Sequence, residues 1–325
     1  MTALSPPGAP RVAILIAAYN AEATIARAVQ SALDQAEAAE VCVIDDASTD
    51  STAAVARACR ARAGQTLTVL TQPANAGPGD ARNAGLAATN ADWIGILDAD
   101  DFMLEGRLGR MLAYAADADF IADELIRTPH PAPTAPILPT DASAPQRLDF
   151  ARFVQGNLGK AGHGRDLGFI KPLARRSFLN AHQIRYRPGM RLGEDYELYA
   201  RALALGARFW LTPAAGYVSV DRPGSISNRH SVEDLRRLRD CDTDLAALRP
   251  LAPAERDALR AHALNIDCRL QWRELIEAVK ARDPAAALAT FRSPQVAAFL
   301  CARLLEQAWL RGLGRDQRSR PAAPA

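Results

Sequence analysis

The segment "WIGILDAD", residues 93–100, joins a short apolar run directly to acidic side chains. Three similar apolar runs precede it: "VAILIAAY" at 12–19, "VCVIDD" at 41–46 and "LTVLTQ" at 67–72. Near-continuous apolar runs at this regular spacing, with helical segments between them, are typical of a parallel sheet covered on both faces. The sequence therefore predicts a doubly wound α/β sheet.

The segments between the runs read as helices. After Asn20, a good helix cap, apolar side chains recur every fourth residue from Ile25 to Leu33. Residues 51–64 and 79–89 predict a second and a third helix. Ligands of such sheets bind outside the carboxyl ends of the strands, so the polar residues at those ends are the candidate site.

The bulk properties exclude several classes of protein. The net charge is +2, which gives no general attraction for nucleic acid. The five cysteines are scattered without a CxxC pair, which argues against a disulfide framework and a zinc knuckle. The chain has no apolar run of bilayer length, and its first residues do not read as a signal peptide. We expect a cytoplasmic protein, soluble or at the inner face of the plasma membrane.

The chain divides into three parts by pattern. Residues 11–127 carry the regular alternation of strands and helices. Six prolines between 128 and 146 indicate a boundary, and residues 128–230 read as mixed helix and strand. Residues 231–325 are helical in pattern, so we expect a helical C-terminal extension.

The second apolar run ends in Asp45 and Asp46. A helix N-terminus that favours acids would explain them, but Ser48 or Asp50 already supplies a cap. Capping therefore does not account for two further acids at the end of the strand. A carboxylate at this place can accept from a nucleobase N–H or a ribose hydroxyl.

The glycine-rich stretch "NAGPGDARNAG", residues 75–85, follows the third run. It departs from the dinucleotide fingerprint because Arg82 stands where the third glycine belongs, and because that fingerprint follows the first strand. A glycine-rich turn with an arginine one helical turn further on suits a phosphate. An ordinary flexible turn is the alternative.

The acidic group after the fourth run is the strongest local signal. Side chains alternate along a strand, so Asp98 and Asp100 are expected to face the same way. Two such carboxylates suit Mg²⁺ or Mn²⁺, which take oxygen ligands and leave sites for a substrate phosphate. Further along, Glu194 and Asp195 precede a helix. Either acid could cap that helix or serve as a general base.

Five motifs in this order resemble the family 2 glycosyltransferases of the GT-A fold. Two further segments, "GFIKP…RRSFL" at 168–179 and "RPGSIS" at 222–227, resemble those of the bacterial exopolysaccharide enzymes, including those of succinoglycan type. The resemblance covers roughly residues 11–230 and rests on "AAYNAEATIARAVQSAL", "VIDDASTDST", "NAGPGDARNAGL", "LDADD" and "GEDYELY". It implies a mixed α/β sheet flanked by helices. It also implies a nucleotide-sugar half over 11–127 and an acceptor half with the catalytic base over 128–230.

The resemblance assigns roles on the donor side. It implies that Asp46 binds the uracil N–H of a UDP-sugar and that Arg82 approaches the phosphates or the base. Asp98 would hold the ribose beside the metal, and Asp100 would bind the Mn²⁺ or Mg²⁺ that bridges the diphosphate. The remaining nucleotide contacts that it implies are Ala18, Tyr19 and Asn20.

On the acceptor side the resemblance implies that Asp195, with Glu194 as the fallback, removes the proton from the attacking hydroxyl. One in-line displacement then inverts the anomeric configuration. Where many relatives have a histidine, this chain has Arg222, which would contact the diphosphate, and His230 is a second candidate for a diphosphate or metal contact. The segment "CRLQWRE", residues 268–274, lacks the QxxRW spacing of processive members, so one sugar is expected to be added.

The acceptor implied is a saccharide or a polyprenyl-linked saccharide. Residues 301–325 hold five arginines against Glu306 and Asp316, so a C-terminal helix could lie on an anionic membrane, pack on the domain or form a homodimer. Two other functions compete. A sugar-nucleotide pyrophosphorylase needs a glycine-rich basic loop that "IAAYNAEAT", residues 16–24, lacks, and a non-catalytic UDP-sugar-binding protein would not need Asp195 beside Asp98 and Asp100.

Overall fold

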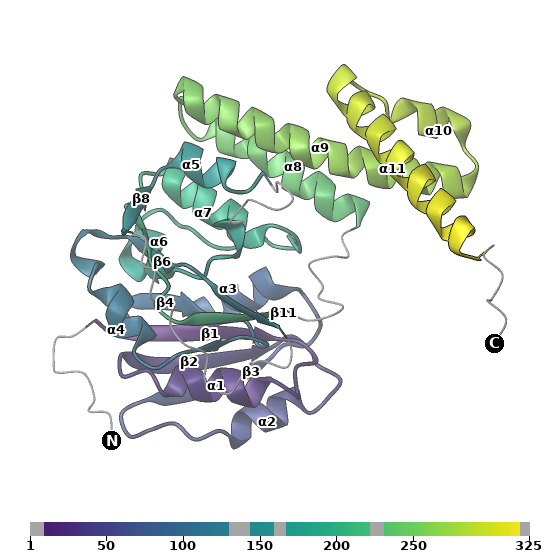
Figure 1. Ribbon diagram of the computed structural model, residues 1–325. Coiled ribbons are helices and arrows are strands. Elements are labelled where there is room, and N and C mark those ends of the chain that lie inside the picture. Colours follow the sequence, from purple (N-terminus) through teal and green to yellow (C-terminus); the bar gives the residue numbers. More distant parts are fainter. Residues whose placement is uncertain (1–9, 130–143, 159–166, 222–230, 319–325) are drawn as a thin grey trace.

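The computed structural model describes residues 10–129, 144–158, 167–221 and 231–318, and in the last helix it describes side chains as far as residue 310. Figure 1 shows a mixed sheet between helices, with long C-terminal helices on one side. The predicted α/β architecture with a helical C-terminal extension is confirmed.

The central sheet has eight strands in the order β3-β2-β1-β4-β9-β6-β10-β8. The first four strands pair in parallel, and β9 runs antiparallel to both β4 and β6. The bounds are β1 (Val12–Ala18), β2 (Ala38–Asp45), β3 (Thr66–Thr71), β4 (Trp93–Ile96), β6 (Phe120–Asp123), β8 (Gln146–Leu148), β9 (Leu173–Arg175) and β10 (Phe209–Thr212). A smaller sheet, in the order β5-β11-β7, consists of β5 (Phe102–Met103), β11 (Tyr217–Asp221) and β7 (Ile126–Pro129).

Helices cover both faces of the large sheet. Alternate side chains of β1 show this: Ala13 and Leu15 pack in one core, while Val12, Ile14 and Ile16 pack in the other. The helices before the extension are α1 (Ile25–Leu33), α2 (Thr52–Ala58), α3 (Pro78–Ala88), α4 (Arg107–Leu112), α5 (Phe150–Gln155), α6 (Arg176–Ala181) and α7 (Glu194–Ala204). Two short 3-10 helices span Ala115–Asp117 and Leu167–Phe169.

Three local predictions were wrong. Helix α1 begins at Ile25 without a side-chain cap, and Asn20 instead lies at φ 49° and accepts from the Thr49 backbone N–H. Helix α2 ends at Ala58, well before residue 64. Strand β4 ends at Ile96, so strand alternation does not reach the acids that follow it, and they lie at a turn.

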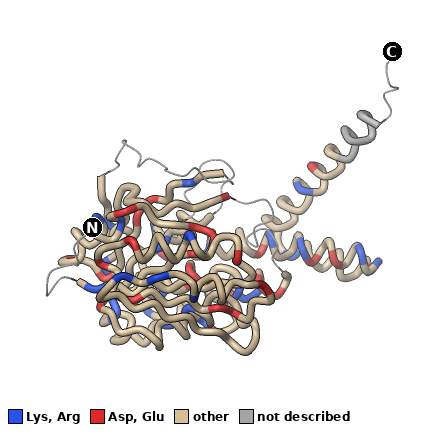
Figure 2. Tube along the Cα trace, turned by 90° about the horizontal axis from the view of Figure 1, so that it is seen from below, with Lys and Arg blue, Asp and Glu red and all other residues tan. Residues whose placement is uncertain are grey.

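The C-terminal extension consists of α8 (Val232–Ala247), α9 (Pro253–Ala281), α10 (Pro284–Ala289) and α11 (Pro294–Arg318). Helix α8 begins with a capping box in which Ser231 and Asp234 bond each other's backbone N–H. Helices α8 and α9 lie side by side over α5 and α7, whereas α11 projects away from the body of the molecule (Figure 2). No helix in the described part of the chain is long and apolar enough to cross a membrane.

A buried polar contact joins the extension to α7. The Tyr196 hydroxyl donates to Asp242 on α8 at 2.8 Å, and the other carboxylate oxygen of Asp242 lies 2.7 Å from His262 Nδ1 on α9. The Tyr196 and His262 rings stack with centroids 4.2 Å apart. All three side chains are buried, so α7, α8 and α9 share one interior.

Candidate active site

The predicted nucleotide residues of the first two strands lie at the carboxyl edge of the sheet. Ala18 ends β1 and is buried, while the Tyr19 ring that follows is 46% exposed. The Asn20 backbone N–H donates to the Ser48 hydroxyl at 3.0 Å. These contacts hold the loops after β1 and β2 together and leave an aromatic face at the edge.

Asp46 joins the second strand to the glycine-rich turn. Its two carboxylate oxygens accept from the backbone N–H groups of Ala76 at 2.9 Å and Gly77 at 2.8 Å. Gly77 has φ +97°, in the region that favours glycine. The side chain therefore has a structural function at this turn, and its contact with a uracil stays a prediction.

Arg82 on α3 lies among acids rather than at the surface. Its side chain is almost fully buried. It donates to Asp98 at 2.8 Å, to Asp195 at 3.0 Å and to Glu194 at 3.2 Å. Burial alone would lower the pKa of the guanidinium, but the Asp195 carboxylate above all raises that pKa well above its usual range. Arg82 thus joins Asp98 to the adjacent pair Glu194 and Asp195, which lie far from Asp98 in the sequence.

Lys171 completes this cluster, and sequence reasoning missed its function. Its ammonium Nζ lies 2.9 Å from Asp98 Oδ2 and 2.7 Å from Asp195 Oδ2. The Tyr186 hydroxyl also donates to Asp195, at 3.1 Å. Lys171 is one of only three lysines in a chain rich in arginine, and it stands in "GFIKP", residues 168–172, which resembles the exopolysaccharide subgroup; these were the available signals.

The beginning of α7 places Glu194 and Asp195. Gly193 precedes them at φ +72°, and a Cβ on it would meet Leu238 of α8 at 2.6 Å. The extension therefore packs directly against the turn that aims the two acids. Burial, reinforced by the neighbouring Asp195 charge, raises the pKa of Glu194.

Asp101 holds the acidic turn to β11. It accepts from the Tyr217 hydroxyl at 2.9 Å and from the Val220 backbone N–H at 2.9 Å. Burial, together with the charges of Asp98 and Asp100, raises the pKa of the Asp101 carboxyl to about 7. The turn therefore concentrates negative charge beside the cluster.

The predicted metal ligands are Asp98 and Asp100. In the described ranges, no group of three or more His, Cys, Asp or Glu side chains is placed to bind a metal ion. Both oxygens of Asp98 already pair with cations, Oδ1 with Arg82 and Oδ2 with Lys171. A divalent ion held by one or two carboxylates and substrate phosphates fits this arrangement. Arg222 and His230 lie outside the described residues.

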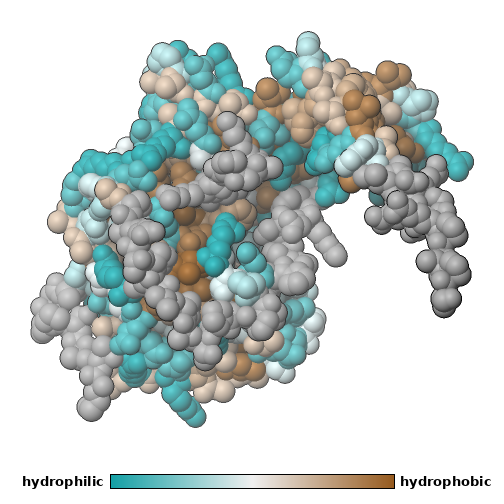
Figure 3. Space-filling model, in the orientation of Figure 1, coloured by the Kyte–Doolittle hydropathy of each residue, from teal (hydrophilic) through white to brown (hydrophobic). Residues whose placement is uncertain are grey.

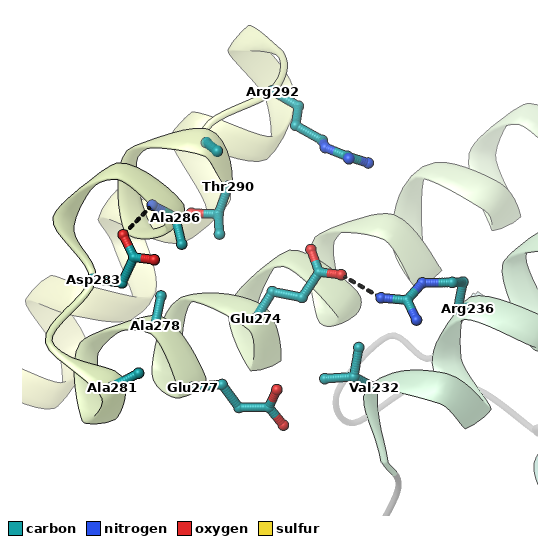
Figure 4. A pocket seen from close by; sticks show the side chains of 11 residues that line it. Val232, Arg236, Glu274, Glu277, Ala278, Ala281, Asp283, Ala286, Thr290 and Arg292 are labelled. Carbon is teal, nitrogen blue, oxygen red and sulfur yellow. Dashed lines mark hydrogen bonds and ion pairs between the residues drawn. The ribbon is translucent and has the colours of Figure 1, made fainter.

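A separate groove of about 460 Å³ lies between α8, α9 and α10 (Figure 4). Arg236 and Glu274 form an ion pair at 2.9 Å across it, and Asp283 caps α10 by accepting from the Ala286 backbone N–H. None of the predicted site residues lines it. The cluster around Arg82 and Lys171 is therefore the candidate active site.

Comparison with known proteins gives the family. Residues 13–134 match the model of glycosyl transferase family 2. The chain is 44% identical over 280 residues to the succinoglycan biosynthesis protein ExoU of Rhizobium meliloti, covering 85% of this chain and 80% of ExoU. It is 38% identical over 223 residues to ExoO of the same organism, covering 67% of this chain and 63% of ExoO.

Solved structures show the same fold. Residues of TarS from S. aureus, in complex with UDP-GlcNAc, superpose with a TM-score of 0.60 at 16% identity, over 86% of this chain and 90% of that one. The mannosyltransferase PcManGT of Pyrobaculum calidifontis, in complex with GDP-Man and Mn²⁺, superposes with a TM-score of 0.57 at 18% identity. The match covers 94% of this chain and 89% of PcManGT. Together with the relatives, these matches show that the chain belongs to glycosyltransferase family 2 and is a glycosyltransferase with the GT-A fold.

Proposed function

We propose that this enzyme moves one sugar from a nucleotide-sugar, preferentially a UDP-sugar, to a saccharide or lipid-linked saccharide during exopolysaccharide synthesis, with inversion. One observation carries the proposal: the predicted base Asp195 and the donor-side carboxylate Asp98 are held by the same two cations. Two relatives named for succinoglycan biosynthesis support the kind of product.

On the donor side we assign the exposed Tyr19 ring, with Ala18, Asn20 and Asp46, to the nucleoside. An exposed aromatic face at the edge of the sheet suits stacking on a base. Asp98 is proposed to hold the ribose, and Arg82, which pairs with Asp98, to approach the phosphates or the base. TarS and PcManGT were solved with UDP-GlcNAc and GDP-Man respectively, which supports a nucleotide-sugar donor.

Asp100, with Asp98, is proposed to hold Mn²⁺ or Mg²⁺ together with the donor diphosphate. When bound there, such an ion would supply Lewis-acid chemistry that neutralises charge on the leaving nucleoside diphosphate. PcManGT contains Mn²⁺, which supports a divalent ion here. Arg222 and His230 remain proposed contacts of the diphosphate or the metal.

Asp195 is proposed to remove the proton from the acceptor hydroxyl as that oxygen attacks the anomeric carbon. The bond to the diphosphate breaks in the same displacement, so a single step inverts the configuration. Tyr186, Arg82 and Lys171 orient the carboxylate through their hydrogen bonds. Glu194, next to it on α7, is the second candidate.

We assign the donor half to residues 11–127, the acceptor half to 128–230 and the extension to 231–325. A lipid-linked acceptor would lie at a membrane, and the extension has a surface that suits one. Hydrophobic side chains gather over α10 and α11 in Figure 3, and Leu305 and Trp309 are 72% and 65% exposed. Because the arginines of residues 301–325 outnumber the acids, we propose peripheral contact with anionic lipid.

Release of nucleoside diphosphate from a panel of UDP- and GDP-sugars, with and without Mn²⁺, tests the proposed function. We expect turnover of one UDP-sugar that depends on the metal and rises when a membrane extract supplies acceptor. Binding of a UDP-sugar without turnover would indicate the non-catalytic alternative. Neither binding nor turnover with any donor would refute the proposed function.

A further inference from the structure

We propose that Lys171 is a positioning residue of the transfer reaction, which fixes the distance between the base Asp195 and the donor-side carboxylate Asp98. The inference rests on the proposed function. It concerns a residue outside the five sequence motifs that identify the family, on the segment that leads into β9.

The four side chains form a closed ring of alternating charge. Oδ1 of Asp98 pairs with Arg82 at 2.8 Å, and its Oδ2 pairs with Lys171 at 2.9 Å. Oδ1 of Asp195 likewise pairs with Arg82 at 3.0 Å, and its Oδ2 pairs with Lys171 at 2.7 Å. Each carboxylate is therefore fixed at both oxygens, and neither can turn about its own axis without breaking an ion pair.

Within this ring the two cations differ. Arg82 also donates to Glu194, so its guanidinium is shared among three acids. Among the residues that the structure describes, the ion pairs of Lys171 join only the two carboxylates on which the reaction is proposed to depend. A lysine ammonium is a compact charge that can donate in several directions, which suits a bridge between two oxygens.

The backbone of Lys171 is anchored independently of the ring. Its carbonyl accepts from Arg107 at 2.7 Å, and Arg107 pairs with Asp123 at 2.6 Å in full burial. The Lys171 side chain is itself only 6% exposed. An ammonium buried to this extent is tolerated only when it is paired, so the ring and the anchor together hold it in one place.

This geometry affects chemistry more than donor binding. The proposed contacts of the base lie on the loops after β1 and β2, away from Lys171 in the sequence. Asp98, proposed for the ribose, is bonded to Lys171 but keeps its ion pair with Arg82 when Lys171 is replaced. Loss of the bridge should therefore misplace the base relative to the sugar and leave donor affinity nearly unchanged. A displacement of about 1 Å at a reacting group can cost about 100-fold in rate.

The test compares Lys171→Met, Lys171→Arg and the matched control Lys280→Met, which removes an exposed lysine at the end of α9. Nucleoside diphosphate release gives kcat, calorimetry gives the donor Kd, and thermal unfolding shows that each variant is folded. We expect kcat of Lys171→Met to fall about 100-fold with the donor Kd within about threefold. The kcat of Lys171→Arg should be at least about tenfold that of Lys171→Met, because arginine restores the positive charge. Lys280→Met should have the kcat and donor Kd of the wild type.

A merely structural role would lower the unfolding temperature of Lys171→Met without this split between kcat and Kd. Three outcomes would each overturn the inference. They are a wild-type kcat in folded Lys171→Met, a donor Kd of that variant that rises as much as its kcat falls, and equal activity of the Met and Arg variants. Should Lys171→Met not fold, Lys171→Gln is judged by the same criteria. A wild-type chain that turns over no donor overturns the proposed function, and this inference with it.

Discussion

The Arg107 guanidinium and the Asp123 carboxylate form an ion pair in which neither side chain has exposed surface. Asp123, at the end of β6, also accepts from the backbone N–H groups of Ala215 and Tyr217, each at 3.1 Å. Arg107 on α4 donates to the carbonyl of Lys171. One buried pair thus joins the large sheet, the small sheet and the segment that carries the bridging lysine.

Asp123→Asn should destabilise the fold strongly, because it leaves the Arg107 charge buried without its counter-charge. We expect a loss of about 3–5 kcal/mol in the free energy of unfolding, measured with denaturant. Asp117→Asn is the control, since its ion pair with Arg208 is at the surface and should be worth less than about 1 kcal/mol. Similar losses in both variants would contradict this account of Asp123.

Asp195→Asn should abolish transfer while leaving the donor bound. General base catalysis contributes about 10²- to 10⁴-fold, so kcat should fall by that factor, while calorimetry should give a donor Kd within about threefold of the wild type. Asp257→Asn, at an exposed position on α9, controls for loss of an acid. An active Asp195→Asn variant together with an inactive Glu194→Gln variant would contradict Asp195 as the base and identify Glu194 as the base instead.

Gly193→Ala should disturb the start of α7 and hence the site. The new Cβ meets Leu238 at 2.6 Å, and the residue has φ +72°, so both packing and backbone oppose it. Gly206→Ala is the matched control, because Gly206 has φ +90° but nothing within 4 Å of a Cβ. We expect about 1 kcal/mol of strain from Gly206→Ala and a larger loss, with reduced kcat, from Gly193→Ala. Equal unfolding temperatures would show that the contact with α8 is unimportant.

Glu255→Gln should destabilise α9 in a manner that depends on pH. Glu255 accepts from both terminal nitrogens of Arg249 and from the Ala252 backbone N–H, and the Arg249 hydrogen bonds lower its pKa. A carboxylate with a lowered pKa stabilises the fold at pH values above its usual pKa near 4.5. That stabilisation is lost as the pH falls through the pKa of the folded state. Glu255→Gln should cost about 1 kcal/mol at pH 7 and little at pH 3. A cost independent of pH would contradict the charge-based explanation, and Glu277→Gln on the same helix serves as control.

Contact of α11 with anionic lipid predicts that the protein floats with vesicles that contain anionic phospholipid and not with neutral ones. Replacing both Leu305 and Trp309 by Gln should abolish this binding, because it removes two of the most exposed apolar side chains of the helix. Val279→Gln, an exposed change on α9, should have no effect. Self-association that is lost in the double variant, without any vesicle binding, would instead identify the helix as a contact between copies of the chain.

The first half of the fold was predictable because β1, β2 and β4 are buried on both faces and are therefore nearly continuous apolar runs, while the partly exposed edge strand β3 follows at the same spacing. Strands β9 and β10 were not, since runs as short as Leu173–Arg175 carry no periodicity and acquire their strand geometry from neighbours in the sheet. The same distinction applies to the site. Arg82 and Asp98 stand in motifs, whereas Lys171 lies outside the five motifs, and only the folding of β9 beside β4 brings it to Asp98 and Asp195.

The buried contact of Tyr196 with Asp242 and His262 constrains how such enzymes can be recombined. Tyr196 directly follows the proposed base, so the side chains that stabilise the catalytic helix come from the extension. A chimera that exchanges acceptor specificity by joining a foreign segment at residue 231 would separate these partners and leave polar groups buried without their bonds. A functional graft has to carry α7, α8 and α9 together, because their buried side chains pack and bond as one unit.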